Sequence, residues 1–286
     1  MSYNRLTNAW SKLASLPTPR SGLAAASAPC PPGQSNTCIY AVGGYNGTTA
    51  VATVESFNPA TNAWSTVASL PTSRFSLAAT AAPCPLGQSG TCVYAVGGVN
   101  ASGGIVANVE SYNPSTNAWS TVTSMARPRY GLGVAAAPCP PGQTDICIYA
   151  AGGNATSTTA SVPIDTVASY NPATNAWSSV APMTTSRTDT SSAVAPCPQG
   201  QTGTCVYALG GAAGGGVTAT VESYNPATNG WTALPGMPTA RNGLAATTTA
   251  CPPGETGTCV YAVGGFAAGG VALGTLEVLD PPRSSD

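Results

Sequence analysis

Three markers recur along the chain with one common spacing, and this repetition constrains the fold more than any other feature. The tryptophans follow one another at steps of 54, 55, 58 and 54 residues: Trp10, Trp64, Trp119, Trp177 and Trp231. The Gly-Gly pairs that end at Gly44, Gly98, Gly153, Gly211 and Gly265 repeat the same steps, and so do five cysteine pairs. A chain with such a period is a tandem array of one supersecondary unit.

The residue pattern of each repeat predicts four short strands and no helix. In the second repeat these strands cover 75–82, 92–96, 108–112 and 118–122. Gly, Pro and Asn separate them, as at Asn113-Pro114, and these residues favour turns and end strand pairing. No segment has the period of an amphipathic helix, so the pattern indicates an all-β fold with four antiparallel strands per repeat.

The repeat also carries a recognisable residue order. The second repeat contains Tyr94-Ala95-Val96-Gly97-Gly98, then Val109-Glu110-Ser111-Tyr112-Asn113-Pro114, then Asn117-Ala118-Trp119, and Arg129 opens the next repeat. All five repeats keep this order over essentially the whole chain, which resembles the kelch family. The resemblance implies a kelch-type β-propeller with one four-stranded blade per repeat. The cysteine pairs depart from ordinary intracellular kelch domains, and five repeats are fewer than kelch propellers usually have.

The two ends of the sequence complement each other. Residues 2–4 and 8–10 match the end of a third strand and a whole fourth strand, whereas 274–281 match a third strand without its fourth. We therefore expect the N-terminal strand to complete the last blade and to close a five-bladed ring, which leaves no exposed edge. The expected single domain spans 1–286, with blades at 20–70, 74–124, 129–181 and 187–235, and a last blade at 241–280 plus 8–15.

Composition excludes several classes of function. Only 7% of the residues are charged and the net charge is -1, so no field attracts nucleic acid. No apolar run is long enough to span a membrane. The chain has no histidine, which removes His-dependent catalysis and imidazole metal sites. We expect no enzyme activity, no cofactor and no metal.

The cysteine pairs bracket the loop between the first and second strands of each repeat. Hairpin geometry brings such ends within reach of a disulfide, and we expect Cys30–Cys38, Cys84–Cys92, Cys139–Cys147, Cys197–Cys205 and Cys251–Cys259. Metal binding is the alternative, but each loop offers two thiols and no histidine. Disulfides persist in oxidising surroundings, so we expect an extracellular or cell-surface protein, although residues 1–6 show no signal-peptide core.

Three Asn-X-Ser/Thr triplets follow Gly-Gly pairs, at Asn46, Asn100 and Asn154. They are candidate N-glycosylation sites in a eukaryotic secretory host. The favoured interpretation is that these residues form turns. The segment 154–165 makes the third repeat longer than the others, and it is either a specificity loop or an unconstrained one.

An arginine opens the first strand of each repeat: Arg20, Arg74, Arg129, Arg187 and Arg241. The kelch resemblance implies that such arginines and neighbouring polar residues, here Ser21 and Asn242, bind ligands on the face that carries the loops after Gly-Gly. A ring of guanidinium groups would suit an anionic ligand. The alternative is a buried ion pair, because Glu55, Glu110, Glu222 and Glu277 also recur. The third repeat has Ala168 instead of this glutamate, with Asp165 and, after Arg187, Asp189 nearby in sequence. Both interpretations stay open at this point.

The recurrent tryptophans and the tyrosines before Gly-Gly are expected to pack between blades rather than to stack on sugars. The sequence thus favours a non-enzymatic extracellular module for binding or adhesion, with a protein or glycan ligand on the arginine face. The alternative is a structural repeat protein that self-associates, as in an extracellular filament or coat, or an engineered repeat scaffold. A glycan-active enzyme is a remote third alternative, because an arginine cluster is present without the remaining sequence motifs of a sialidase.

Overall fold

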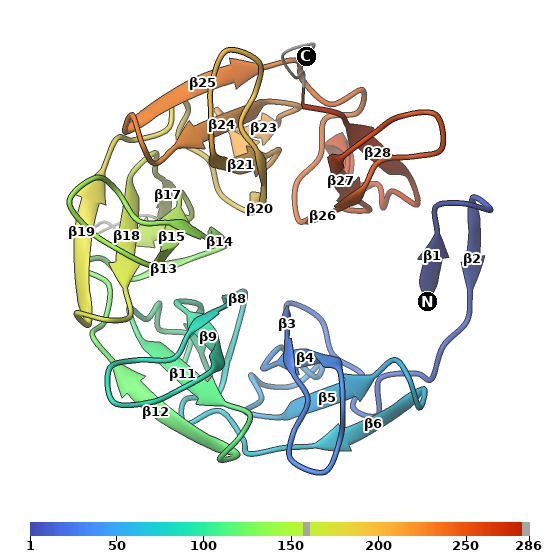
Figure 1. Cartoon of the computed structure of the whole chain (residues 1–286), viewed down its shortest axis with the longest axis vertical. Coiled ribbons are helices and arrows are strands. Elements are labelled where there is room, and N and C mark those ends of the chain that lie inside the picture. The colour runs from blue at the N-terminus through green and yellow to red at the C-terminus, as the bar shows by residue number, and fades with distance from the viewer. Residues whose placement is uncertain (157–160, 282–286) are drawn as a thin grey trace. The chain divides into compact units, whose positions relative to one another are not determined.

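The computed structural model describes residues 1–156 and 161–281, and the regular elements in this part of the chain are almost all antiparallel β-strands (Figure 1). The chain divides into two compact units. The first comprises Met1–Tyr130 with Pro172–Trp177, and the second comprises Gly131–Asn171 with Ser178–Asp286. In the described part of the chain, a short 3-10 turn at Ala268–Gly270 is the helical element, and no helix there is long and apolar enough to cross a membrane.

The first unit contains two four-stranded sheets. One has the order β3-β4-β5-β6, with β3 at Ala24–Pro29, β4 at Thr37–Val42, β5 at Val54–Asn58 and β6 at Ala63–Thr66. The next has the order β8-β9-β11-β12, with β8 at Ala78–Pro83, β9 at Thr91–Val96, β11 at Val109–Asn113 and β12 at Ala118–Val122. The first strands β3 and β8 lie beside each other (Figure 1).

The same four-stranded order recurs further along the chain. One sheet joins β14 (Gly133–Pro138), β15 (Ile146–Ala151), β18 (Val167–Asn171) and β19 (Ala176–Val180). Another joins β20 (Ser191–Pro196), β21 (Thr204–Leu209), β24 (Val221–Asn225) and β25 (Gly230–Leu234). A three-stranded sheet then joins β26 (Ala245–Ala250), β27 (Thr258–Val263) and β28 (Leu276–Leu279). In the second unit, β20 lies between β14 and β26.

Short strands sit beside the sheets, where the arginines and Gly-Gly pairs lie. They are β7 (Arg74–Phe75), β10 (Val99–Asn100), β13 (Arg129–Tyr130), β16 (Asn154–Thr156), β17 (Ser161–Pro163), β22 (Ala212–Ala213) and β23 (Gly216–Val217). Residues 157–160 of the long loop at 154–165 lie outside the described residues.

The strands of the second repeat confirm the predicted pattern with one correction. The expected first strand at 75–82 is split into β7 and β8. The reason is Ser76, which adopts a left-handed backbone with φ of 51° and so interrupts the extended conformation. Arg74 and Phe75 pair with β10 instead of continuing into β8.

The N-terminal hairpin joins β1 (Ser2–Asn4) to β2 (Ala9–Ser11). Its register, with Tyr3 opposite Trp10, is that of a third and a fourth strand, as for Tyr112 opposite Trp119. β1 therefore occupies the edge of β2 that a closing third strand would need. Among the described pairings, β28 pairs with β27. The completion of the last sheet by the N-terminal strand stays a prediction, and so does a closed, five-bladed single domain.

Aromatic side chains from successive strands form the core of each sheet. Tyr112 packs against Trp119 with ring centroids 5.3 Å apart, and it also contacts Tyr40 of the preceding repeat at 5.5 Å. The hydroxyl of Tyr94 donates a hydrogen bond to the carbonyl oxygen of Pro83 at 2.7 Å. Burial raises the pKa of Tyr112 to about 12, so its hydroxyl stays protonated and can donate. These rings pack within and between repeats, as the sequence predicted.

A pair of hydrogen bonds clamps the fourth strand to the repeat before it at Trp64, Trp119, Trp177 and Trp231. Trp119 Nε1 donates to the carbonyl oxygen of Ala68 at 2.8 Å, and the amide of Ala68 donates to Asn117 Oδ1 at 2.9 Å. The same indole bond joins Trp64 to Ala14, Trp177 to Thr123, and Trp231 to Ala181. The tryptophans and Asn-Ala-Trp motifs therefore hold consecutive repeats together.

The Gly-Gly pairs form a second joint between repeats. The amide of Gly44 donates to the carbonyl oxygen of Arg74 in the next repeat at 2.9 Å. A Cβ on Gly43 would lie 2.5 Å from that oxygen, and Gly43 has a left-handed φ of 62°. Glycine is needed here because any side chain would collide with the neighbouring backbone. The joint fixes the start of each repeat against the loop of the repeat before it.

Candidate functional site

The predicted disulfides are confirmed in all five repeats. Each bridge closes a hairpin between a first and a second strand, with Cα atoms 4.8 to 4.9 Å apart: Cys30–Cys38, Cys84–Cys92, Cys139–Cys147, Cys197–Cys205 and Cys251–Cys259. In the last repeat, Glu255 and Asp280 approach the Cys251–Cys259 bridge. Both sulfur atoms are already bonded to each other and offer no thiolate to a metal. The cysteine loops are therefore structural staples.

The arginine that opens each repeat reaches its own third strand. In the first repeat, Arg20 Nη1 lies 2.6 Å from Glu55 Oε2, and Arg20 Nη2 donates to the carbonyl oxygen of Ala41 at 3.0 Å. The second carboxylate oxygen of Glu55 accepts from the hydroxyl of Thr18 at 3.0 Å. The side chains of Arg20 and Glu55 are 0% and 2% exposed. This is a shielded ion pair in which both Nη atoms of Arg20 and both carboxylate oxygens of Glu55 have partners within the protein.

Three more repeats carry the same ion pair: Arg74–Glu110, Arg187–Glu222 and Arg241–Glu277. Burial lowers the pKa of Arg74 and Arg187, and the adjacent glutamate opposes this effect. The ion-pair interpretation therefore holds for Arg20, Arg74, Arg187 and Arg241. Their direct binding to a ligand stays a prediction, and the geometry does not support it.

Arg129 belongs to the repeat that has Ala168 in place of the glutamate. It is also buried, with 4% of its surface exposed. Burial lowers its pKa to about 10, and the positive charge of Arg127 adds to this effect. At this position a second cation therefore takes the place that a glutamate has beside the other repeat arginines.

At four of the repeat arginines, the residue after the arginine forms a backbone bridge with the residue after Gly-Gly. We call these pairs the rungs; those described are Ser21–Tyr45, Phe75–Val99, Thr188–Ala212 and Asn242–Phe266. The predicted site residues Ser21 and Asn242 thus lie at rungs, where Ser21 is exposed and Asn242 is partly exposed. The rungs lie at the arginine end of each sheet, whereas the cysteine loops lie at the other end.

Aromatic residues that the repeat does not require stand beside the repeat arginines or the Gly-Gly pairs in both units. Apart from the recurrent positions on the second, third and fourth strands, the aromatic residues of the chain are Tyr45, Phe75, Tyr130 and Phe266. Each stands directly after a repeat arginine or directly after a Gly-Gly pair. In the first unit, the rings of Tyr45 and Phe75 lie 5.4 Å apart and are both partly exposed. In the second unit, Phe266 is 48% exposed.

Sequence reasoning missed these aromatic residues as a group. The available signal was their departure from the repeat, since every other aromatic side chain has counterparts in the other repeats. Partly exposed rings at the ends of strands are common in binding surfaces, because they bring a large contact area with little side-chain entropy.

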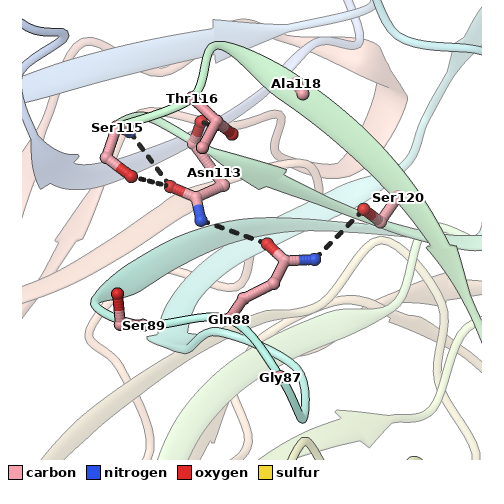
Figure 2. Close-up of a pocket in the computed structure, with 8 residues that line it drawn as sticks. All are labelled: Gly87, Gln88, Ser89, Asn113, Ser115, Thr116, Ala118 and Ser120. Atoms are coloured by element: carbon pink, nitrogen blue, oxygen red, sulfur yellow. Dashed lines mark hydrogen bonds between the residues drawn. The ribbon is translucent and has the colours of Figure 1, made fainter.

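A polar pocket lies at the opposite, cysteine-loop end of the second repeat (Figure 2). It has a volume of about 300 Å³, and its lining includes Gln88, Asn113, Ser115 and Ser120. Gln88 bridges the pocket, because its Oε1 accepts from Asn113 Nδ2 at 3.1 Å and its Nε2 donates to Ser120 Oγ at 3.2 Å. The same glutamine–asparagine bond recurs at Gln34–Asn58, Gln143–Asn171 and Gln201–Asn225. The bridge is thus a structural tie between the cysteine loop and the third strand.

Two of the Asn-X-Ser/Thr triplets form turns, as favoured above, but this interpretation is wrong for the third, because Asn154–Thr156 form strand β16. Asn46 Oδ1 accepts from the amides of Thr48 and Thr49 at 3.0 and 2.9 Å. Asn100 Oδ1 accepts from the amides of Ser102 and Gly104 at 3.1 and 2.8 Å. Glycosylation at Asn46, Asn100 and Asn154 stays a prediction.

Repeated four-stranded antiparallel sheets with the Gly-Gly, Glu-Ser-Tyr and Asn-Ala-Trp elements define the blades of a kelch-type β-propeller. The family model of the Kelch motif matches four times, at residues 26–71, 81–126, 137–184 and 200–238. The chain belongs to the kelch family.

Curated relatives agree with this assignment. Kelch-like protein 36 of Mus musculus is 30% identical over 224 residues, which is 75% of this chain and 32% of the relative. Kelch-like protein 23 of Homo sapiens is 27% identical over 207 residues, 71% of this chain and 32% of the relative. The chain therefore spans about a third of the length of these relatives. The match to the solved structure of YjhT covers 94% of this chain and 84% of the YjhT chain, with a TM-score of 0.66 and 16% identity. The two proteins therefore share the fold.

Proposed function

We propose that this chain is a non-enzymatic, extracellular kelch propeller that binds a protein or glycan through the arginine end of its sheets. The observation that carries the proposal is the placement of Tyr45, Phe75, Tyr130 and Phe266 beside the repeat arginines. In a nearly regular array, the repeat itself explains the packing residues. Departures that place aromatic rings at one end of the strands are typical of a selected surface.

The arginines stabilise the segments that carry this surface. Each ion pair fixes the segment that carries a rung, because the guanidinium group ties the residue before the rung to the third strand. We therefore assign the ligand contacts to the rung side chains and to Ser21 and Asn242, rather than to the guanidinium groups. Aromatic rings with neighbouring hydroxyl and amide groups suit both a sugar ring and a peptide.

The disulfides support the extracellular location. Five bridges within 286 residues are rare in proteins that fold in the reducing cytosol. The kelch relatives named above span additional regions that this chain does not match, so their partners are no guide to its ligand.

Self-association as a structural protein is the second candidate function. The observation that favours it is the low charge, since only 7% of the residues are charged and close packing of copies would desolvate few ions. Exposed apolar side chains such as Leu86, which is 80% exposed, are compatible with such contacts.

Glycan-array and peptide-display binding by the purified chain tests the proposal. We expect the double variant Tyr45→Ala/Phe75→Ala to lose binding at an unchanged melting temperature. Leu86→Ala, at the cysteine-loop end, is the matched control and should bind like the wild type. Loss of binding in Leu86→Ala alone would contradict the proposal and would place the site at the cysteine-loop end of the sheets. Ordered oligomers in sedimentation experiments, without binding to either library, would support the structural function instead.

A further inference from the structure

The fourth repeat departs from the others at the start of its first strand. After the arginine, the other repeats continue with a variable residue, then Gly or Ser, then Leu and two small or apolar residues. The fourth repeat reads Thr188-Asp189-Thr190-Ser191-Ser192, so five successive side chains are polar. Polar groups in a buried segment are costly unless they are hydrogen-bonded or bind something.

Two of these five residues are explained by internal hydrogen bonds. Thr190 replaces the recurrent leucine, and its hydroxyl donates to the carbonyl oxygen of Leu209 at 3.0 Å. Ser191 Oγ accepts from the amide of Ala246 on the neighbouring strand β26 at 2.9 Å. These two hydroxyl groups therefore serve the packing of the second unit.

Thr188, Asp189 and Ser192 are not explained in this way. Thr188 is 5% exposed, and its hydroxyl oxygen has no hydrogen-bond partner in the described structure. The hydroxyl oxygen of Ser192 is likewise buried without a partner there. Burial raises the pKa of the Asp189 carboxyl above its ordinary value, because the charged form is desolvated.

The three side chains face one stretch of the preceding repeat. A Cβ on Gly131 would lie 2.5 Å from Asp189 Oδ1 and 2.7 Å from Thr188 Oγ1. The closest atom to a Cβ on Gly133 would be Ser192 Oγ. Asp189 and Thr188 thus pack against Gly131, and Ser192 packs against Gly133, where the side chain of any other residue would collide with their oxygen atoms. All of these residues belong to the second unit.

The backbone of Asp189 is strained as well. It adopts a left-handed φ of 51°, whereas Gly22, Gly131 and Gly243 occupy this position in three of the other repeats. A glycine would adopt that conformation without the steric cost that a side chain brings. A strained, desolvated acid in place of a glycine is the kind of departure that binding sites retain.

We propose that Asp189, Thr188 and Ser192 bind an ammonium group carried by the ligand of this protein. A carboxylate and two hydroxyl groups supply three acceptors, and an ammonium group has three donors. A positive charge would also offset the desolvation of the carboxylate. The inference rests on the proposed binding function for its biological meaning, but it involves none of the aromatic rung residues.

Nuclear magnetic resonance with n-butylammonium as the probe tests the site directly. We expect saturable shifts of the amides of residues 188–192, and none with n-butanol, which has the same chain without the charge. Asp189→Gly introduces the residue that three of the other repeats have, and it should fold at least as stably as the wild type, yet lose the response at least tenfold. Asp189→Asn keeps the size of the side chain, and it should also lose the response.

The outcomes separate this site from the proposed function. An unchanged response in Asp189→Gly, or no saturable response in the wild type, would overturn the ammonium site even if the rung variants lose ligand binding. A response to calcium chloride but not to n-butylammonium would show a metal site instead. A response to n-butylammonium that depends on Asp189 would support the inference even if no array ligand is found.

Discussion

Arg20 Nη1 lies 2.6 Å from Glu55 Oε2, and water reaches almost none of either side chain. Removing one member of a buried pair leaves the other charge uncompensated, which typically costs about 3–5 kcal/mol. We therefore expect Arg20→Ala to lower the free energy of unfolding by about this amount. Urea unfolding measures the change.

The double variant Arg20→Met/Glu55→Leu is the control for this pair. It removes both charges and keeps most of the volume, so it should recover much of the lost stability. An Arg20→Ala protein that unfolds like the wild type but loses ligand binding would contradict the structural role of the pair.

The indole of Trp119 links two repeats through its bond to Ala68. Trp119→Phe keeps the ring packing against Tyr112 but removes the donor, so we expect a loss of about 1 kcal/mol in unfolding free energy. Trp10→Phe is the matched control, because Trp10 is 50% exposed. It should change the stability by less than about 0.5 kcal/mol. Equal effects at the two positions would argue against the clamp.

The bridge between Cys84 and Cys92 closes a short loop, with a sequence separation of 8. In the chain-entropy account, such a bridge stabilises the fold by roughly 2–3 kcal/mol. We expect Cys84→Ser/Cys92→Ser to lower the unfolding free energy by this amount. Adding a reductant to the wild type should lower it further, since all five bridges would open. A wild type that is equally stable with and without reductant would contradict a stabilising role.

The buried carboxyl of Asp189 predicts a pH dependence. Its pKa is raised in the folded protein above the ordinary 3.8, so folding favours the protonated form. The cost of ionising it is absent below that ordinary value and develops as the pH rises through the folded pKa. The contribution of Asp189 to the free energy of unfolding should therefore fall over this range, and Asp189→Asn should lose that contribution. Chemical unfolding of both proteins from about pH 3 to about pH 7 tests this, and parallel curves would refute it.

The repeat made much of the fold predictable. Strands such as 118–122 were bounded by turn residues, and the cysteine spacing left hairpin disulfides as the natural pairing. The break within 75–82 was harder to predict, because serine rarely adopts a left-handed backbone. The aligned Gly22 and Gly131 carry the signal for that conformation, and Ser76 inherits it from the repeat.

The site was less predictable than the fold. Recurrence of Arg20 and Glu55 fits both a ligand ring and an ion pair, and only their distance decides between them. Asp189 is close to Arg187 in the sequence, but the ion-pair partner of Arg187 is Glu222. The contacts of Asp189 come from Gly131, a residue of another repeat, and such proximity depends on how strands of successive repeats pack.

The joint between Gly-Gly and the next arginine has one further consequence. Gly44, Gly98 and Gly153 donate to Arg74, Arg129 and Arg187 at the same distance of 2.9 Å, although the third repeat is the longest. The loop between Gly-Gly and the third strand can therefore change in length and sequence while both of its ends stay fixed. These loops are natural grafting positions, where foreign segments could be inserted to build a library of binders on one scaffold.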